Sequence, residues 1–173
     1  MNIMNDSKSL KKIIFKISIW IPVIMMEFVI FGFSGQNGEQ SGGLSSKIAS
    51  IMVDSADKVG IIDIDEAGKQ ILIDKMQYPI RKCAHMTEYA IFAAFTFIAL
   101  YYDGIRKRWT YFFAVFIAFL FACTDEFHQL FVPGRSGQFT DVCIDTIGAC
   151  IGIFIIFLIR KIIYCRNKKS MLS

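Results

Sequence analysis

Two short polar stretches place each of the chain's two histidines near a carboxylate at helical spacing. In RKCAHMTEY, the residues Arg81, His85 and Glu88 are spaced i, i+4 and i+7, so on a helix they share one face. In DEFHQ, the carboxylate of Asp125 stands three residues before His128. A histidine poised by a carboxylate can act as a general base, so these two pairs are the first candidates for proton transfer.

Further charged groups follow along the chain, and each can be explained either by a functional role or by a purely structural one. Arg135 comes directly after a Pro-Gly turn. It is interpreted either as a loop charge that neutralises neighbouring acids or as a clamp for phosphate or carboxylate, which arginine binds bidentately. Asp141 and Asp145 are one helical turn apart. Asp141 alone also fits an acid that stabilises a helix N-terminus. In the same way, Arg81 and Glu88 fit a structural ion pair.

The sequence does not favour a metal ion or a cofactor. The histidines and carboxylates are an alternative zinc site, but no HExxH pattern or ligand triad on one helix supports it. The five cysteines form no CxxC. Cys83 and Cys143 are expected near the outer surface, where a disulfide is the alternative to two free thiols. No serine or cysteine stands beside a convincing base, so the residues predict no cofactor and no nucleophile.

These polar residues lie within or beside long apolar runs. Hydrophobic residues make up 54% of the 173 residues, including 17 Phe, which is too apolar for an ordinary soluble domain. Runs of about 18 or more mostly apolar residues can cross a bilayer. We therefore predict an all-α, single-domain integral membrane bundle with four transmembrane helices, at about residues 13–33, 85–102, 109–127 and 144–164. The first run is interpreted as an anchor, because it is too long for a secretory signal and no A-x-A-like cleavage site follows it.

The distribution of basic residues predicts the orientation of the bundle. Basic clusters precede the first run, fill the short loop between the second and third runs, and follow the fourth run: Lys8, Lys11 and Lys12; Arg106, Lys107 and Arg108; Arg160, Lys161, Arg166, Lys168 and Lys169. The positive-inside rule places all three clusters in the cytoplasm. We predict a multi-pass protein of the bacterial cell membrane with both termini cytoplasmic. The net charge of +4 then reflects topology and attraction to membrane lipids, and no nucleic-acid partner is predicted.

The first outward connection is long and is predicted to be ordered. Within residues 40–78, the segments LSSKIASIMVDSADKV and DIDEAGKQILIDKMQ each repeat apolar residues at helical spacing. They are expected to form amphipathic helices on the outer membrane surface or over the bundle. Tyr78-Pro79 is expected to end the second helix.

Small residues indicate which helix faces point into the bundle. Gly148 and Gly152 form a G-x-x-x-G on the stripe that also carries Asp145, and such spacing lets two membrane helices approach closely. Polar groups inside a membrane bundle are functional candidates by default. The predicted outward-facing polar site consists of Glu27, Arg81, His85, Glu88, Asp125, Glu126, His128, Gln129, Arg135, Asp141 and Asp145.

These stretches together closely resemble the VanZ-like family of bacterial membrane proteins. The resemblance rests on FSGQ, RKCAHMTEYAIFA and DEFHQLFVPGRSGQFTDVCIDTIGA, in this order from about Phe33 to Gly152. The H-Q-x-F-V-P-G-R-S core is its most specific part. The family often has Ser where this chain has Gly35 and Phe where it has Met86, and neither difference changes a charged position.

The resemblance implies a four-helix membrane domain and, for the member that gives the family its name, reduced susceptibility to teicoplanin-type glycopeptide antibiotics. It transfers no catalytic residues, only motif positions, which here are Arg81, Lys82, His85, Glu88, Tyr89, Asp125, Glu126, His128, Gln129, Pro133, Gly134, Arg135, Asp141 and Asp145.

Three functional hypotheses follow. The first is recognition of an amphiphilic envelope molecule, either a lipid-linked cell-wall precursor or a lipoglycopeptide, by the cationic rim of Arg81, Lys82 and Arg135. The second is an enzyme that acts on an envelope lipid or its head group, with His85 or His128 as general base. The third is a non-catalytic membrane scaffold that binds another protein through the outer helices and the G-x-x-x-G seam.

Overall fold

The computed structural model describes residues 3–170, and most of this range is helical. In chain order the helices are α1 (Ile3–Ser34), α2 (Gly38–Lys58), α3 (Glu66–Tyr102), α4 (Lys107–Gln129) and α5 (Phe139–Ser170). The predicted all-α fold is confirmed, since residues 3–170 contain these five helices and no strand.

Four of the helices are long and apolar enough to cross a membrane. The candidate spans are Leu10–Ser34, Glu66–Tyr102, Arg108–Gln129 and Phe139–Lys168, and each contains one of the predicted runs. Their outward faces carry large hydrophobic side chains, such as Phe28 with 75% of its surface exposed. A contiguous apolar surface of this kind is unfavourable in water and favourable against lipid tails. The outside of the bundle therefore has the character of a membrane protein.

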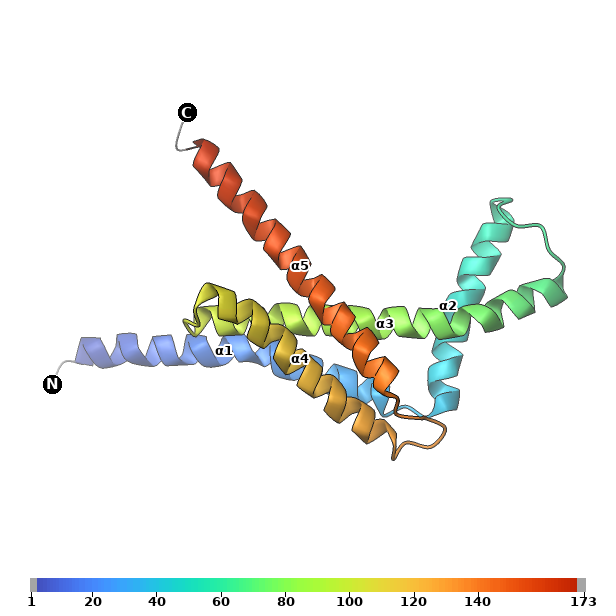
Figure 1. Ribbon diagram of the computed structural model, residues 1–173, viewed down its shortest axis with the longest axis horizontal. Coiled ribbons are helices and arrows are strands. Elements are labelled where there is room, and N and C mark those ends of the chain that lie inside the picture. Colours follow the sequence, from blue (N-terminus) through green and yellow to red (C-terminus); the bar gives the residue numbers. More distant parts are fainter. Residues whose placement is uncertain (1–2, 171–173) are drawn as a thin grey trace.

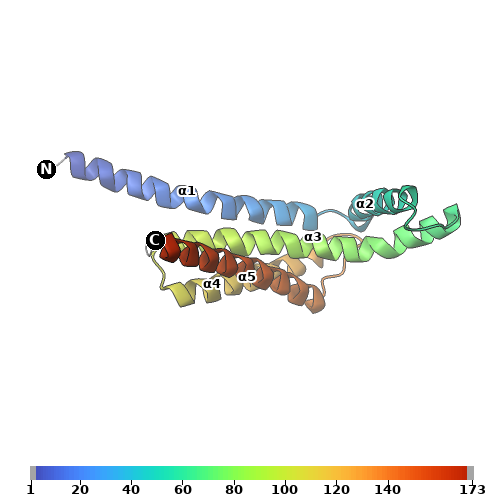
Figure 2. The same ribbon diagram turned by 90° about the horizontal axis from the view of Figure 1, so that it is seen from above.

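Helix α3 is the central element of the bundle (Figures 1 and 2). Helix α1 lies along one side of it, and α4 and α5 pack on the other side, with α5 crossing α3 obliquely. The start of α1, the α3–α4 connection and the last turns of α5 lie toward one end, here named the inner end. The α1–α2 and α4–α5 connections lie toward the opposite, outer end.

The predicted amphipathic segments pack against each other as a hairpin at the outer end. Helix α2 lies against the first third of α3, and buried Ala49, Val53 and Ile73 form a small core between them. The expected helix end at Tyr78-Pro79 is wrong, because α3 continues through Pro79 into the membrane span. Proline removes one backbone donor, but helices in membrane proteins tolerate this loss where neighbouring segments support them. Here α2 supplies that support on the N-terminal side of Pro79.

The predicted small-residue seam is confirmed. A Cβ atom added to Gly148 would collide with the carbonyl oxygen of Met86, and one added to Gly152 would collide with that of Ala90. Helices α3 and α5 are therefore in backbone contact along this seam. On α4, the side chains of Ala114, Ala118 and Ala122 are completely buried against the same core.

The inner end has a polar cluster of its own, composed of Lys16, Trp20, Asp103 and Arg160. The Lys16 ammonium lies 3.2 Å from Asp103 Oδ1, and the Trp20 indole N–H donates to Asp103 Oδ2 at 3.0 Å. The Arg160 guanidinium lies over the ring of Tyr101, 4.3 Å from its centroid. These contacts connect α1 and α5 to the inner end of α3.

Candidate functional site

A polar pocket opens at the outer end between α3, α4, α5 and the α4–α5 connection. It holds about 80 Å³ of space that water can enter. Its lining residues, which define the polar pocket, are Tyr78, Arg81, Lys82, His85, Glu126, Gln129, Gly134, Arg135, Ser136, Gln138, Asp141 and Asp145. Three segments that are distant in sequence thus meet around one small polar space.

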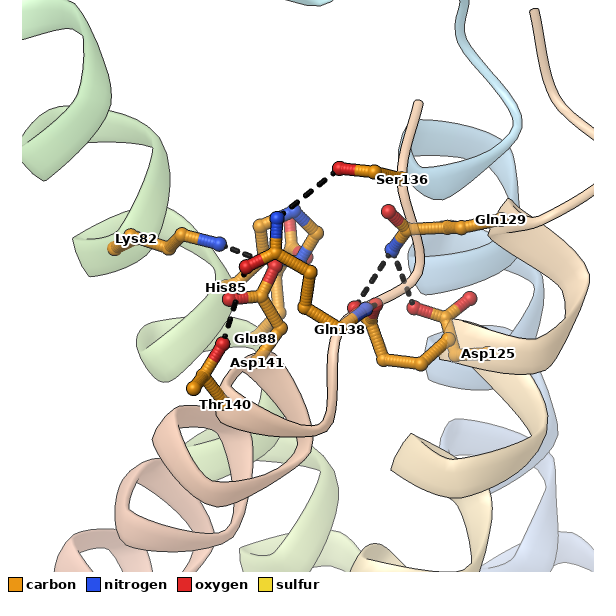
Figure 3. A network of polar contacts seen from close by, with 10 residues as sticks. Lys82, His85, Glu88, Asp125, Gln129, Ser136, Gln138, Thr140 and Asp141 are labelled. Atoms are coloured by element: carbon orange, nitrogen blue, oxygen red, sulfur yellow. Dashed lines mark hydrogen bonds and ion pairs between the residues drawn. The ribbon is translucent and has the colours of Figure 1, made fainter. Parts of the chain in front are cut away.

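Helix α3 brings cationic and titratable groups to the pocket from consecutive turns. Arg81, Lys82 and His85 line it together because Arg81 and Lys82 stand four and three residues before His85, on the same side of the helix. The Lys82 ammonium forms an ion pair with the Asp141 carboxylate, so it links α3 to the first turn of α5 (Figure 3). His85 Nδ1 lies 3.6 Å from Glu88 Oε2, which is too long for a hydrogen bond. Neither of these two atoms has a hydrogen-bond partner among the described residues.

Helix α4 contributes a carboxylate whose position is fixed by two donors. The Gln129 amide donates to Glu126 Oε1 at 3.0 Å, and the backbone N–H of Gln138 donates to Glu126 Oε2 at 2.9 Å. The same Gln129 amide lies 3.5 Å from Asp125 Oδ2 (Figure 3). Asp125 is completely buried behind the pocket, and its Oδ1 has no hydrogen-bond partner in the described chain.

The α4–α5 connection holds Arg135 over the pocket through backbone contacts. Gly134, with φ of 73°, adopts the left-handed conformation that favours glycine. Arg135 Nε then donates to the Gln36 carbonyl at 3.1 Å, and a terminal nitrogen donates to the Phe33 carbonyl at 3.3 Å. The loop is therefore attached to the end of α1.

Arg135 is held near another cation instead of a carboxylate partner. Burial first, and the neighbouring Arg81 charge second, lower the pKa of the Arg135 guanidinium, whereas Glu126 raises it to a smaller extent. The group remains charged at neutral pH, because an arginine pKa is ordinarily above about 12. Among the described side chains, neither Arg81 nor Arg135 forms a salt bridge with an acid. The pocket thus contains two cations close together without direct counterions.

Helix α5 contributes two further carboxyl groups to the polar pocket. Asp141 lies in its first turn, and Asp145 follows one turn later with 2% of its surface exposed. No hydrogen bond or ion pair found within residues 3–170 involves the Asp145 carboxylate, although Asp145 lines the pocket. The close α3–α5 approach at Gly148 lies directly below and keeps Asp145 in the interior.

A second pocket, here called the side pocket, adjoins the polar pocket toward α1 and α2. It holds about 140 Å³ and shares Arg81, His85 and Arg135 with the polar pocket. Its remaining wall is largely apolar or small and consists of Phe33, Gln36, Ser41, Leu44, Ser45, Ile48, Ile80, Ala84 and Glu88. The shared residues therefore stand between a polar space and a mainly apolar one.

The structure brings together most, but not all, of the predicted site residues. Arg81, His85, Glu126, Gln129, Arg135, Asp141 and Asp145 line the polar pocket. Glu88 lines the side pocket, and Asp125 lies behind Gln129. Glu27 is half-buried on α1 and lines neither pocket, and His128 is exposed, with its ring edge-on to Phe31.

Some lining residues were not in the predicted site. Lys82 was predicted in the cationic rim and among the motif positions but not in the polar site itself, and its ion pair shows that it belongs to the pocket wall. Ser136 and Gln138 are loop residues whose contacts depend on the fold of the connection, where the Gln138 amide donates to the Ser136 hydroxyl at 3.1 Å. Tyr78 stood at the expected helix end, and it reaches the pocket because α3 continues through Pro79.

The described chain contains no group of three or more His, Cys, Asp or Glu residues arranged to hold a metal ion. Cys83 and Cys143 are both free thiols and not a disulfide. His85 is the histidine that lines both pockets, together with Arg81 and Arg135.

Residues 19–160 match the family model described as VanZ/LLP1. The matched range contains all residues of both pockets and confirms the resemblance inferred from the motifs. No curated protein matches the chain, and no solved structure matches it.

Proposed function

The chain belongs to the VanZ/LLP1 family, and from this premise we propose that it recognises the anionic head group of an envelope amphiphile at its polar pocket. The ligand is a lipid-linked cell-wall precursor, another envelope lipid or a lipoglycopeptide. In this proposal the protein spans the bacterial cell membrane with both termini in the cytoplasm and the polar pocket facing outward. Protection against teicoplanin-type antibiotics is a property that such recognition can produce.

The observation that carries this proposal is the pair of arginines without acidic partners. Arg81 and Arg135 line the same small pocket, and burial and mutual repulsion are the largest influences on the Arg135 pKa. Two adjacent cations in a partly buried site are unfavourable unless an anion joins them. Arginine matches phosphate and carboxylate oxygens bidentately, so an anionic head group is the ligand that best compensates this arrangement.

The position of the arginines favours an amphiphile over a free anion. The same two side chains line the mainly apolar side pocket, whose rim includes Leu44 and Ile48 with about half of each side chain exposed. A ligand with its anionic group at the arginines can thus extend its carbon chain past these residues toward the lipid phase. A free phosphate would contact only the polar pocket and would leave the apolar wall of the side pocket unused.

Lipid binding to the purified full-length protein tests the proposal. Native mass spectrometry would compare phosphatidylglycerol with a glucosyl diacylglycerol of the same acyl chains, which has a hydrated head group but no phosphate. We expect phosphatidylglycerol to bind at least tenfold more tightly. The double substitution Arg81→Gln with Arg135→Gln should remove this preference, because it removes both unpaired cations.

Arg108→Gln is the matched control, since Arg108 lies at the inner end over the ring of Trp109. This variant should keep the wild-type preference. Equal binding of both lipids by the wild-type protein, or an unchanged preference in the double variant, would contradict the proposal.

One observation favours an enzyme as a second candidate. His85 stands in the wall shared by both pockets, with Glu88 as its nearest acidic neighbour on the same helix. A general base in this position would reach the junction between the head group and the carbon chain of a bound amphiphile. Incubation of purified protein with envelope lipid extract tests this candidate. It requires a product that forms with the wild-type protein and not with His85→Gln.

A further inference from the structure

We infer that the ligand's head group combines a phosphate with a hydrogen-bond donor, either a hydroxyl or an ammonium group, and that Asp145 accepts from this donor. The inference rests on the proposed function, because it names the head-group chemistry that the same polar pocket takes. The ligand class is a lipid phosphodiester with a small, donor-bearing head group.

The polar pocket is lined by two kinds of charged side chain. Arg81 on α3 and Arg135 in the connection contribute guanidinium groups, whereas Glu126 on α4 and Asp145 on α5 contribute carboxyl groups. Lys82 and Asp141 neutralise each other. A ligand that fills the space therefore meets both arginine donors and carboxyl acceptors. Arginine only donates hydrogen bonds and a carboxylate only accepts them.

Glu126 and Asp145 differ in the number of hydrogen-bond donors that they receive from the described chain. Glu126 already accepts from the Gln129 amide and from the Gln138 backbone, one donor on each oxygen. Asp145 is almost completely buried and receives no such donor within the described chain. Because Asp145 lines a space that water can enter, a ligand that displaces this water must supply a donor in its place. Asp145 is therefore the residue that selects for a donor.

The size of the polar pocket limits the head group. Its 80 Å³ of accessible space corresponds to roughly five to eight water-sized positions at about 10–15 Å³ each. This is about the size of a phosphate, with five non-hydrogen atoms, and roughly three further atoms of a polar group. A long saccharide would have to leave the pocket through its opening.

These properties also define lipids that should bind poorly. Phosphatidic acid places additional negative charge where the carboxylates of Glu126 and Asp145 stand, and it carries no neutral or cationic donor beyond the phosphate. Phosphatidylcholine has a cationic head group, but its quaternary nitrogen has no N–H to donate. Phosphatidylglycerol and phosphatidylethanolamine each supply a donor, one as a hydroxyl and the other as an ammonium group.

The test compares these four lipids, with identical acyl chains, by native mass spectrometry or competition binding to the purified full-length protein. We expect at least one of the donor lipids, phosphatidylglycerol or phosphatidylethanolamine, to bind at least tenfold more tightly than both phosphatidic acid and phosphatidylcholine. Whether phosphatidylglycerol or phosphatidylethanolamine binds more tightly identifies the donor as hydroxyl or ammonium.

Asp145→Asn is the decisive variant, because its amide keeps the shape of the side chain and replaces one acceptor oxygen by an N–H donor. It should reduce the preference of the donor lipids over phosphatidylcholine at least fivefold. Asp63→Asn, in the exposed α2–α3 connection, is the control for removal of an acid. A melting scan of each variant confirms that it is folded.

The outcomes separate this inference from the proposed function. If the arginines govern binding of phosphate lipids but phosphatidic acid binds as tightly as the donor lipids, the inference about Asp145 is overturned and the proposed function stands. The same conclusion follows if Asp145→Asn leaves lipid preference unchanged. If the phosphate-free glycolipid binds as tightly as phosphatidylglycerol, the proposed function itself fails.

Discussion

The outer polar pocket and the inner polar cluster use similar charged residues in different ways. At the inner end, Asp103 receives both the Lys16 ammonium and the Trp20 N–H, and Arg160 is covered by the Tyr101 ring. At the outer end, Arg81 lies over the Tyr78 ring and Arg135 donates to two backbone carbonyls, but neither forms a salt bridge with an acid within residues 3–170. The acid of the inner cluster is thus paired within the chain, whereas the two arginines that share the outer pocket have no acidic partner in the described residues.

This difference separates a structural role from a functional one. Satisfied charges at a helix end fix the position of the helix and require no ligand. Buried charges without partners lower stability, and proteins keep them mainly where function requires them. The comparison predicts that substitutions at the outer end change binding and that equivalent substitutions at the inner end change little.

The largest effect is expected from closing the space that the outer pocket depends on. Gly148→Leu places a side chain where the Met86 backbone lies, so α5 must move away from α3. We expect a loss of lipid binding and a fall in melting temperature of about 10 °C or more, because core overpacking typically costs about 1–3 kcal/mol and here involves rigid backbone. Gly32→Leu is the control, since nothing lies within 4 Å of the added Cβ atom there. A Gly148→Leu protein with wild-type binding would show that the pocket does not depend on the seam.

The next effect compares an ion pair at each end. Lys82→Gln leaves the Asp141 carboxylate without its partner in a site where both side chains are only 14% exposed. We expect a loss of about 2 kcal/mol of stability and weaker binding of phosphate lipids, since the pocket gains net negative charge. Lys16→Gln breaks the inner pair, in which the side chains are 42% and 32% exposed, and should cost less than about 1 kcal/mol with no change in binding. Thermal scans and lipid titrations of both variants measure the difference, and equal effects would remove the distinction between the two ends.

A third prediction concerns two residues of the DEFHQ motif, two positions apart, of which only the first lines the polar pocket. Glu126 lines the polar pocket, whereas His128 is exposed outside it. In a teicoplanin-sensitive host, we expect the wild-type protein to protect, Glu126→Gln to lose protection and His128→Ala to keep it, at matched membrane levels. The minimal inhibitory concentration is the readout. Loss of protection in both variants would extend the site to the outer surface of α4, and no protection by the wild-type protein would refute the proposed link to teicoplanin.

Much of this architecture was predictable because membrane helices have strong sequence signals. Long apolar runs predicted the four spans, and the glycines at 148 and 152 predicted a close helix–helix contact. The structure shows that the partner helix, which the sequence did not identify, is α3. The continuity of α3 was not predictable from Pro79 alone, because proline is a strong signal of a helix end and the packing of α2 that supports the helix is a tertiary effect.

The candidate site was predictable in composition but not in detail. Three charged stretches of similar depth indicated a common location, since helix ends in a membrane must meet at similar levels. Periodicity could not show that His128 turns outward at the end of α4 or that Gln138 donates its backbone N–H to Glu126. Such contacts depend on the path of the α4–α5 connection, which local sequence does not determine.

The smallest predicted effects are opposite in sign at the two ends. Asp145→Asn replaces a buried, unpaired carboxylate by a neutral group of the same shape, so in the absence of lipid it should raise stability by about 1 kcal/mol. Asp103→Asn weakens two satisfied contacts at the inner end and should lower stability by at most about 1 kcal/mol. Melting curves of delipidated protein in one detergent measure both changes.

Because a bound lipid stabilises only the form that binds it, adding the preferred lipid should reduce or reverse the advantage of Asp145→Asn and leave the Asp103→Asn difference unchanged. A lower stability of Asp145→Asn without lipid would mean that the carboxylate is already satisfied within the fold, and the contrast between the two ends would then be lost at this residue.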